Sequence, residues 1–528
     1  MKTVTKKVIV ALLIILSLFM ALSVVYMARF TIKAAYNSVL PPAEITSVDL
    51  TEDEKAEDFE YFYNTVISSV PSIDNYAEAY GFSFRDRKEY YEELIRGTKN
   101  DFEYYAVMDA IIQDVPSFHT DLLYPGSYDS VNCYNADKIS SDRGVIAYSD
   151  YWCDILDDEK DKDNNDYYSF LYKDGDYYFS ELESTACEEM SGSRLVTVDG
   201  VSADEYIISR PFAYNLYFDG KNDKPCRTRI VFNGSKGKEC SVVLLTDAGE
   251  VLECTLFADI YLERVFLEKT RDIYSSNVSS EDPIAFENDN AAYVKIDNMS
   301  PRYAGKVEEL LKNIKSENII LDLRENYGGN NQFAAEHIYP YLFSERITER
   351  STFFIPISDA NKCIASNVFD AMMVRLKTAD TNPFDIDTEM YICTKTNSYV
   401  GAVKSNRNVV ILSSHYTGSA ADTFIHDMRK NDLAYVIGNN TGGEGLGYSF
   451  VESKLPNSNL AFIYNPGCAY TFDGFDNSVY GTRPDCYLET TDDFISYLDN
   501  NQPSELDELC ANDDTIRYAY EYLMGALY

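Results

Sequence analysis

Residues 319–330 read Ile-Ile-Leu-Asp-Leu-Arg-Glu-Asn-Tyr-Gly-Gly-Asn, an apolar strand that runs into a Gly-Gly turn. An earlier strand is indicated at Ala292–Ile296. Between the two, apolar residues recur at the i, i+3, i+4, i+7 spacing of one helix face, namely Val307, Leu310, Leu311 and Ile314. Strand, helix and strand in this order predict a unit of an α/β core with a parallel sheet.

A second unit of the same kind follows. Apolar strands at Val409–Leu412 and Ala434–Ile437 bracket a helix over about Ser419–Met428. On such sheets ligands bind at the carboxyl ends of the strands. The Gly-Gly turn lies at that edge, and so does Ser414-His-Tyr-Thr-Gly-Ser-Ala-Ala-Asp422.

Both turns carry groups that stabilise negative charge. The amides of Gly328 and Gly329 are suited to hold an anion or an oxyanion. Ser419 stands at a helix amino terminus, where the field favours developing negative charge. Each turn also has a purely structural explanation, because glycine permits tight turns and small residues let a helix pack closely on a sheet.

Taken together and in this order, the motifs resemble the tail-specific or carboxy-terminal processing serine peptidases, including their tricorn-like relatives. The resemblance covers residues 285–495, where Gly438–Gly445 and Gly481–Asp485 also follow the family pattern. It implies an α/β catalytic core of the ClpP/crotonase-like type. A shorter match at Leu195–Gly200 is similar to a strand of the family's PDZ-like domain.

The resemblance also implies a set of site residues. Ser419 matches the family's nucleophile, and the amide of Ala420 with an amide of Gly328 or Gly329 would form the oxyanion hole. The processing proteases place a lysine where this chain has Glu444, so their Ser-Lys pair is absent. Another general base is needed, because a serine hydroxyl is a poor nucleophile at its free pKa.

The chain has four histidines, and His119 is our predicted base. Its segment, Pro116–Thr120, is similar to an early stretch that supplies the base in tricorn-like members. Glu444 is then an orienting or substrate-amine-binding carboxylate, with an exposed loop carboxylate as the alternative. The other histidines fit less well: His426 is about 10.5 Å along the helix from Ser419, His337 lies within a helix, and His415 suits either the site's mouth or a surface turn.

Outside this core, the sequence predicts helical, β-rich and loop segments. Residues 45–135 are predicted to be helical, beginning with a capping box at Thr51 and Glu54. Residues 136–260 are predicted to be β-rich, with 190–258 as either a PDZ-like or an ordinary β module. The acidic run 157–166 lacks the glycine and glutamate of a calcium loop and is predicted to be a solvated loop. Residues 496–528 form a C-terminal extension.

The N-terminus carries a predicted membrane anchor. Residues 8–28 hold 21 consecutive uncharged positions, enough to cross a bilayer, although a cleaved signal peptide is the alternative. Lysines at positions 2, 6 and 7 predict a cytoplasmic tail at 1–7 and an extracytoplasmic remainder. All eleven cysteines lie in that remainder, where disulfides persist, and their spacing predicts no pairing.

These observations predict a membrane-anchored extracytoplasmic serine endopeptidase that cleaves unfolded or C-terminally exposed protein segments by acyl transfer. The net charge of −40 excludes nucleic acid as a partner, and no metal, nucleotide or other cofactor is implied. The main rival is a catalytically inactive peptide- or ligand-binding protein with the same fold, suggested by the missing lysine. A structural cell-surface protein would explain the charge but not the motifs.

Overall fold

The computed structural model describes residues 45, 47–128, 143–185, 187–277, 282–361, 364, 377–378, 389–448, 450–488 and 505–526. The anchor predicted at 8–28 and the tail at 1–7 lie outside these residues. No helix in the described ranges is both long and apolar enough to cross a membrane.

The α/β core is built on a sheet whose strands follow the order β11-β12-β13-β17-β18-β22. Only β11 is antiparallel to its neighbour; the other pairs are parallel, as the strand-helix-strand units predicted. The central strands are buried apolar runs, which is typical of parallel sheets covered on both faces. Their bounds are β11 (Ile284–Glu287), β12 (Ala292–Lys295), β13 (Asn318–Asp322), β17 (Asn408–Ser413), β18 (Ala434–Gly438) and β22 (Cys486–Tyr487).

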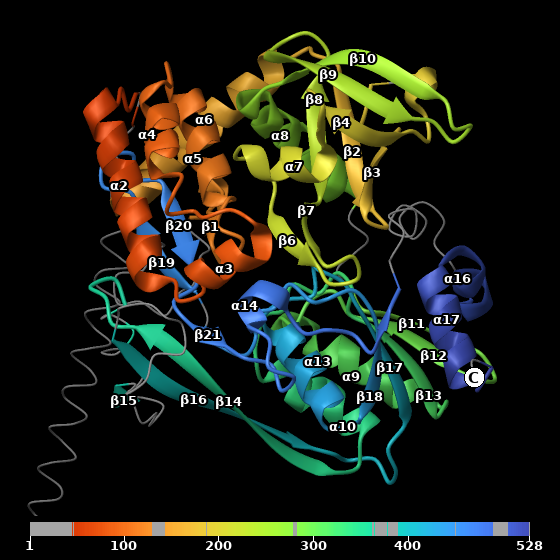
Figure 1. Cartoon of the computed structure of the whole chain (residues 1–528). Coiled ribbons are helices and arrows are strands. Elements are labelled where there is room, and N and C mark those ends of the chain that lie inside the picture. Colours follow the sequence, from red (N-terminus) through yellow and green to blue (C-terminus); the bar gives the residue numbers. More distant parts are fainter. Residues whose placement is uncertain are drawn as a thin grey trace, which may run out of the picture.

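Helices cover both faces of this sheet (Figure 1). Apolar side chains of α9 (Ala304–Asn313), α10 (Tyr339–Leu342) and α13 (Ala420–Lys430) pack on one face. The other face is covered by α16 (Leu506–Asn512) and α17 (Asp514–Leu523), which we call the C-terminal cap. Residues 505–526 of the extension predicted at 496–528 therefore contribute to the core.

A separate antiparallel sheet lies beside the core, in the order β15-β16-β14-β21. Its long strands β14 and β16 pair along their full length (Figure 1). The bounds are β14 (Arg346–Pro356), β15 (Lys377–Thr378), β16 (Met390–Val400) and β21 (Cys468–Ala469).

The N-terminal region is helical, as predicted, and Thr51 and Glu54 form the predicted capping box. Its helices are α2 (Glu52–Ser69), α3 (Ile73–Tyr80), α4 (Lys88–Arg96), α5 (Asp101–Ile112) and α6 (Arg143–Lys162). Just after His119 the chain forms β1 (Asp121–Leu122), which pairs with β20 (Ala461–Tyr464) beside β19 (Val451–Lys454). This pairing ties the N-terminal region to the segment that follows the core helix α13.

Helix α6 corrects two predictions. Residues 143–162 are helical, whereas a β-rich region was expected to begin at 136. The acidic run 157–166 was predicted to be a loop, but residues 157–162 form the last turns of this helix. The cause is a buried stripe at helical spacing, Val145, Trp152 and Leu156, which fixes the helix in the core while its acidic end faces solvent.

The β-rich region forms a sheet in the order β3-β2-β8-β10-β9-β4-β5, and a pairing of β3 with β4 joins its two sides. Helices α7 (Ala203–Ser209) and α8 (Ile260–Asn277) belong to this part of the chain, which also extends the hairpin β6-β7 toward the core (Figure 1). The bounds are β2 (Tyr167–Lys173), β3 (Asp176–Phe179), β4 (Arg194–Val198), β5 (Val201–Ser202), β6 (Leu216–Asp219), β7 (Lys224–Arg227), β8 (Arg229–Asn233), β9 (Lys238–Leu245) and β10 (Val251–Ala258).

A buried ion-pair network joins the C-terminal cap to the end of β13. Arg324 donates through Nη2 to Asp322 Oδ2 at 2.6 Å and through Nη1 to Asp513 Oδ2 at 2.7 Å. Tyr293 OH also donates to Asp322, at 2.8 Å. Because a buried charge is tolerated only when paired, each member of this network holds the others in place.

We expect Asp513→Ala to lower the free energy of unfolding of the cap by about 3–5 kcal/mol, because Arg324 Nη1 loses its buried partner. Asp513 also accepts hydrogen bonds from the amides of Thr515 and Ile516, so Asp513→Asn, which keeps a capping oxygen, isolates the effect of charge. Hydrogen exchange of the α17 amides measures the stability of the cap in both Asp513 variants. Asp514→Asn, at an exposed residue, is the control. Unchanged exchange in both Asp513 variants contradicts the prediction.

Candidate active site

Ser419 occupies a sharp turn between β17 and α13. It is the N-cap residue of α13, with φ 53° and ψ −119°. Non-glycine residues rarely adopt this conformation, which costs about 1–3 kcal/mol and occurs most often at functional sites. The turn is held by a hydrogen bond from the Ser419 amide to the Gly443 carbonyl, at 2.9 Å. The side chain of Ser419 is therefore presented, partly exposed, at the start of a buried helix.

The Gly-Gly turn after β13 lies directly against Ser419. A Cβ added to Gly328 would be 2.7 Å from Ser419 Cβ and 2.8 Å from the Ala420 nitrogen, so only glycine allows this approach. The Gly328 amide donates to Asn326 Oδ1 at 2.9 Å. The amides of Gly329 and Ala420 have no acceptor among the described residues. Of the two glycines predicted for an oxyanion hole, Gly329 is thus the one whose N–H group is available.

Glu444 joins the His119 segment to the core. Its Oε2 accepts a hydrogen bond from the His119 amide at 2.7 Å and lies 3.1 Å from His119 Nδ1. Its Oε1 accepts from Ser117 Oγ at 2.6 Å and from Tyr76 OH at 3.4 Å. The carboxylate is buried, which excludes the alternative of an exposed loop residue. The carboxylate therefore lies beside the imidazole of His119, although Nδ1 makes no hydrogen bond among the described residues.

Phe118 brings this pair to Ser419. A Cβ added to Gly418 would lie 2.3 Å from the Phe118 ring, and one added to Gly442 would lie 2.6 Å from it. Residue 118 therefore packs directly on the turn that carries Ser419. The fold gathers Ser419, Ala420, Gly328, Gly329, His119 and Glu444 in one region.

Asp422 has a buried carboxylate that binds several segments around the site, and this role was not predicted from the sequence. Its Oδ1 accepts hydrogen bonds from the hydroxyls of Thr441 and Thr482, at 2.5 and 2.6 Å. Its Oδ2 accepts from the Gly445 amide and from Asn477 Nδ2, each at 3.1 Å. One carboxylate in the first turn of α13 thereby fixes the segment that carries Glu444. The signal was present in the sequence, since both threonines belong to the family-like motifs.

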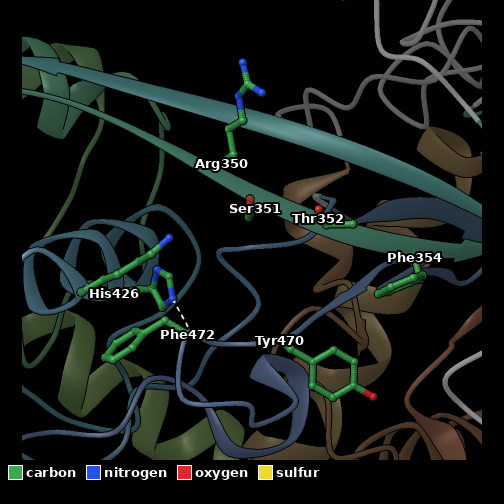
Figure 2. A pocket seen from close by; sticks show the side chains of 8 residues that line it. Arg350, Ser351, Thr352, Phe354, His426, Tyr470 and Phe472 are labelled. Atoms are coloured by element: carbon green, nitrogen blue, oxygen red, sulfur yellow. Dashed lines mark hydrogen bonds between the residues drawn. The ribbon is translucent and has the colours of Figure 1, made fainter.

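The other histidines are engaged elsewhere. Figure 2 shows His426 in a cavity of about 220 Å³, where its Nε2 accepts a hydrogen bond from the Phe472 amide at 3.2 Å. His337 Nδ1 lies 2.8 Å from Glu308 Oε1. His415 stacks on Tyr217 with ring centroids 4.0 Å apart, and burial lowers the pKa of His415 to about 3. An imidazole with so low a pKa is an inefficient general base at neutral pH.

Lys395 enters the site from β16, and no sequence motif pointed to it. Its Nζ donates to the Gly445 carbonyl at 2.9 Å and to Asn331 Oδ1 at 3.3 Å. The ammonium group thus links the segment after the Gly-Gly turn to the segment that carries Glu444. Burial lowers the pKa of Lys395 to about 8, although the carboxylates of Asp427 and Asp422 favour its charged form.

Residues 290–488 match the model of peptidase family S41, which confirms the resemblance drawn from the motifs. These residues carry the sequence pattern of that family, and on this match the chain is a serine-type peptidase, a hydrolase. No curated protein matches the chain at a significant level.

The solved structures that match this chain share little sequence with it. Mature CPAF is 11% identical to this chain. The match covers 88% of this chain and 98% of the CPAF chain, with a TM-score of 0.49. The photosystem II D1 C-terminal processing protease is 13% identical, with coverages of 82% and 92% and a TM-score of 0.34. Tricorn protease is 14% identical, covers 90% of this chain and 37% of its own, and has a TM-score of 0.32.

The lowered pKa of Lys395 predicts a pH-dependent difference in stability. The folded protein releases this proton near pH 8, whereas the unfolded chain holds it until about pH 10.5. Between these values the unfolded state binds more protons, so wild type should gain stability relative to Lys395→Met, by at most about 1.4 kcal/mol per pH unit. Below pH 8 the difference should be constant.

Urea unfolding of both proteins from pH 7 to pH 10 measures this difference. Lys404→Met, at an exposed lysine, is the control. A flat difference across the whole range would show that the pKa of Lys395 is unchanged on folding, and one that falls as the pH rises would show that folding raises it; either result contradicts the prediction.

Proposed function

We propose that the chain is a serine endopeptidase of the tail-specific type, which cleaves unfolded or C-terminally exposed protein segments. The observation that carries the proposal is the strained Ser419 turn packed against two available amides and the His119–Glu444 pair. The pair replaces the lysine of the processing proteases with an imidazole that lies beside a carboxylate. Other serine hydrolases with a histidine base combine the same three groups, a serine nucleophile, a histidine and a carboxylate.

The reaction begins when Ser419 Oγ attacks the carbonyl carbon of the scissile bond. His119 Nε2 takes the hydroxyl proton, while Glu444, beside Nδ1, stabilises the imidazolium that forms. The Ala420 and Gly329 amides donate to the oxyanion. Collapse of the tetrahedral intermediate breaks the C–N bond, and His119 returns the proton to the leaving amine. Water then hydrolyses the acyl-enzyme by the same proton transfers and restores Ser419.

We expect Ser419→Ala to abolish cleavage and His119→Ala to lower kcat by about 10²–10⁴-fold, the usual contribution of general base catalysis. Glu444→Gln should cause a smaller loss, because the imidazole keeps a polar neighbour of the same size but loses the compensating charge. His426→Ala is the matched control, since this histidine lies in the separate cavity of Figure 2. Mass spectrometry of an unfolded protein and a peptide mixture after incubation measures all four variants.

The outcomes separate the alternatives. Cleavage that survives His119→Ala but not Ser419→Ala retains the peptidase and overturns its base, which would turn attention to Lys395. A folded wild-type chain that cleaves nothing would favour a peptide- or ligand-binding protein with the peptidase fold.

The β-rich region and the N-terminus complete the proposal. A PDZ-like module at 190–258 would pair a substrate segment as an added strand. The uncharged run 8–28 would anchor the chain, with the peptidase outside the cytoplasm.

The anchor predicts that the full chain stays with membranes through alkaline extraction, whereas a chain starting at residue 31 does not. External protease should digest residues 45–528 in intact cells or spheroplasts. Release of the full chain by alkali, or its protection from external protease, would contradict the anchoring or the orientation respectively.

A further inference from the structure

Tyr327 is unusually exposed for an aromatic residue next to a catalytic turn. It directly precedes Gly328, and 60% of its surface is accessible. It does not stand alone, because its ring stacks on Phe118, with centroids 6.1 Å apart and planes at 26°. On another side it meets Tyr416, with centroids 5.8 Å apart. We call Phe118, Tyr327 and Tyr416 the aromatic shelf.

Two of the shelf's rings are held in place from behind. Phe118 fills the space left by the absent side chains of Gly418 and Gly442. Tyr416 contacts the His415 ring, with centroids 3.8 Å apart, and His415 in turn stacks on Tyr217 of β6. A ligand that binds these rings therefore meets a largely ordered surface, so less conformational freedom is lost on binding.

The shelf adjoins the reacting groups on two sides. Tyr327 leads into the glycines whose turn abuts Ser419, and Phe118 is the residue before His119. Single exposed aromatic residues are common on protein surfaces. Rings in mutual contact beside a nucleophile form a specific apolar surface, and aromatic and large aliphatic side chains are the groups that such a surface binds best.

The overall charge of the chain acts in the same direction. A net charge of −40 disfavours acidic peptides near the surface, whereas apolar side chains are not repelled. The most exposed ring of the shelf is that of Tyr327, because Phe118 and Tyr416 are partly buried. Tyr327 is thus the residue whose ring a substrate would contact most.

We propose that the aromatic shelf binds an aromatic or large aliphatic side chain of the substrate next to the scissile bond and so determines which bonds are cut. This inference rests on the proposed function and adds the substrate class to it. Tyr327 is the specificity-determining residue, and its ring rather than its hydroxyl makes the contact.

The test compares cleavage sites in an unfolded protein digested by wild type, Tyr327→Ala and Tyr327→Phe. We expect aromatic and large aliphatic residues to be enriched at one position beside the cut bonds in wild type and Tyr327→Phe. For a pair of peptides that differ only by Phe or Ala at that position, the kcat/KM ratio should fall at least about tenfold in Tyr327→Ala. A general loss of activity cancels in this ratio.

Tyr90→Ala removes another exposed tyrosine, on α4, and should leave the ratio unchanged. Absence of enrichment in wild type, or a ratio that is the same in Tyr327→Ala, overturns the proposal while leaving the peptidase intact.

A binding measurement tests the shelf without catalysis. Decapeptides of Gly, Ser and Asn that carry a single Phe, Ala or Asp are titrated into the full-length Ser419→Ala chain. We expect the Phe peptide to bind at least about tenfold more tightly than the Ala peptide, and Tyr327→Ala in the same background to remove the difference. Equal binding of all three peptides overturns the shelf even if the chain cleaves nothing.

Discussion

The candidate active site depends on the buried carboxylate of Glu444. Removing a carboxylate from water costs several kcal/mol unless hydrogen bonds and charge compensate. Here the compensation comes from another part of the chain, through His119, Ser117 and Tyr76. The N-terminal helical region is therefore a structural component of the site and supplies its proposed base. The β1–β20 pairing, immediately after this segment, holds the two parts together.

A second constraint is steric and acts around Ser419. The backbone is strained at this residue, and glycine is required where neighbouring segments approach it, at Gly328 and Gly418. Strain of this kind persists only when its surroundings hold it in place. Asp422 does so from within α13, by binding the segments on either side of Glu444. Catalytic geometry and local packing thus rely on the same few contacts.

The strands of the core could be predicted because each is a continuous apolar run bounded by turn residues, as at 319–323. The site turns could be predicted because they join glycine or small residues to strand ends. Helix α6 was missed because the acidic run at its end concealed the stripe that includes Trp152. Lys395 could not be found in the sequence, since only the pairing of β16 with β14 and the folding of both onto the core bring it to Gly445. The exposure of Tyr327 likewise depends on the tertiary structure.

The distance along the chain between His119 and Ser419, 300 residues, has a consequence for the protein's biosynthesis. The segment with the proposed base leaves the ribosome long before the nucleophile, and the threonine at 482 that helps fix Asp422 comes later still. The helices that cover one face of the core sheet are made after that threonine. The contacts that hold the site therefore cannot all form until the chain has been synthesised through Thr482.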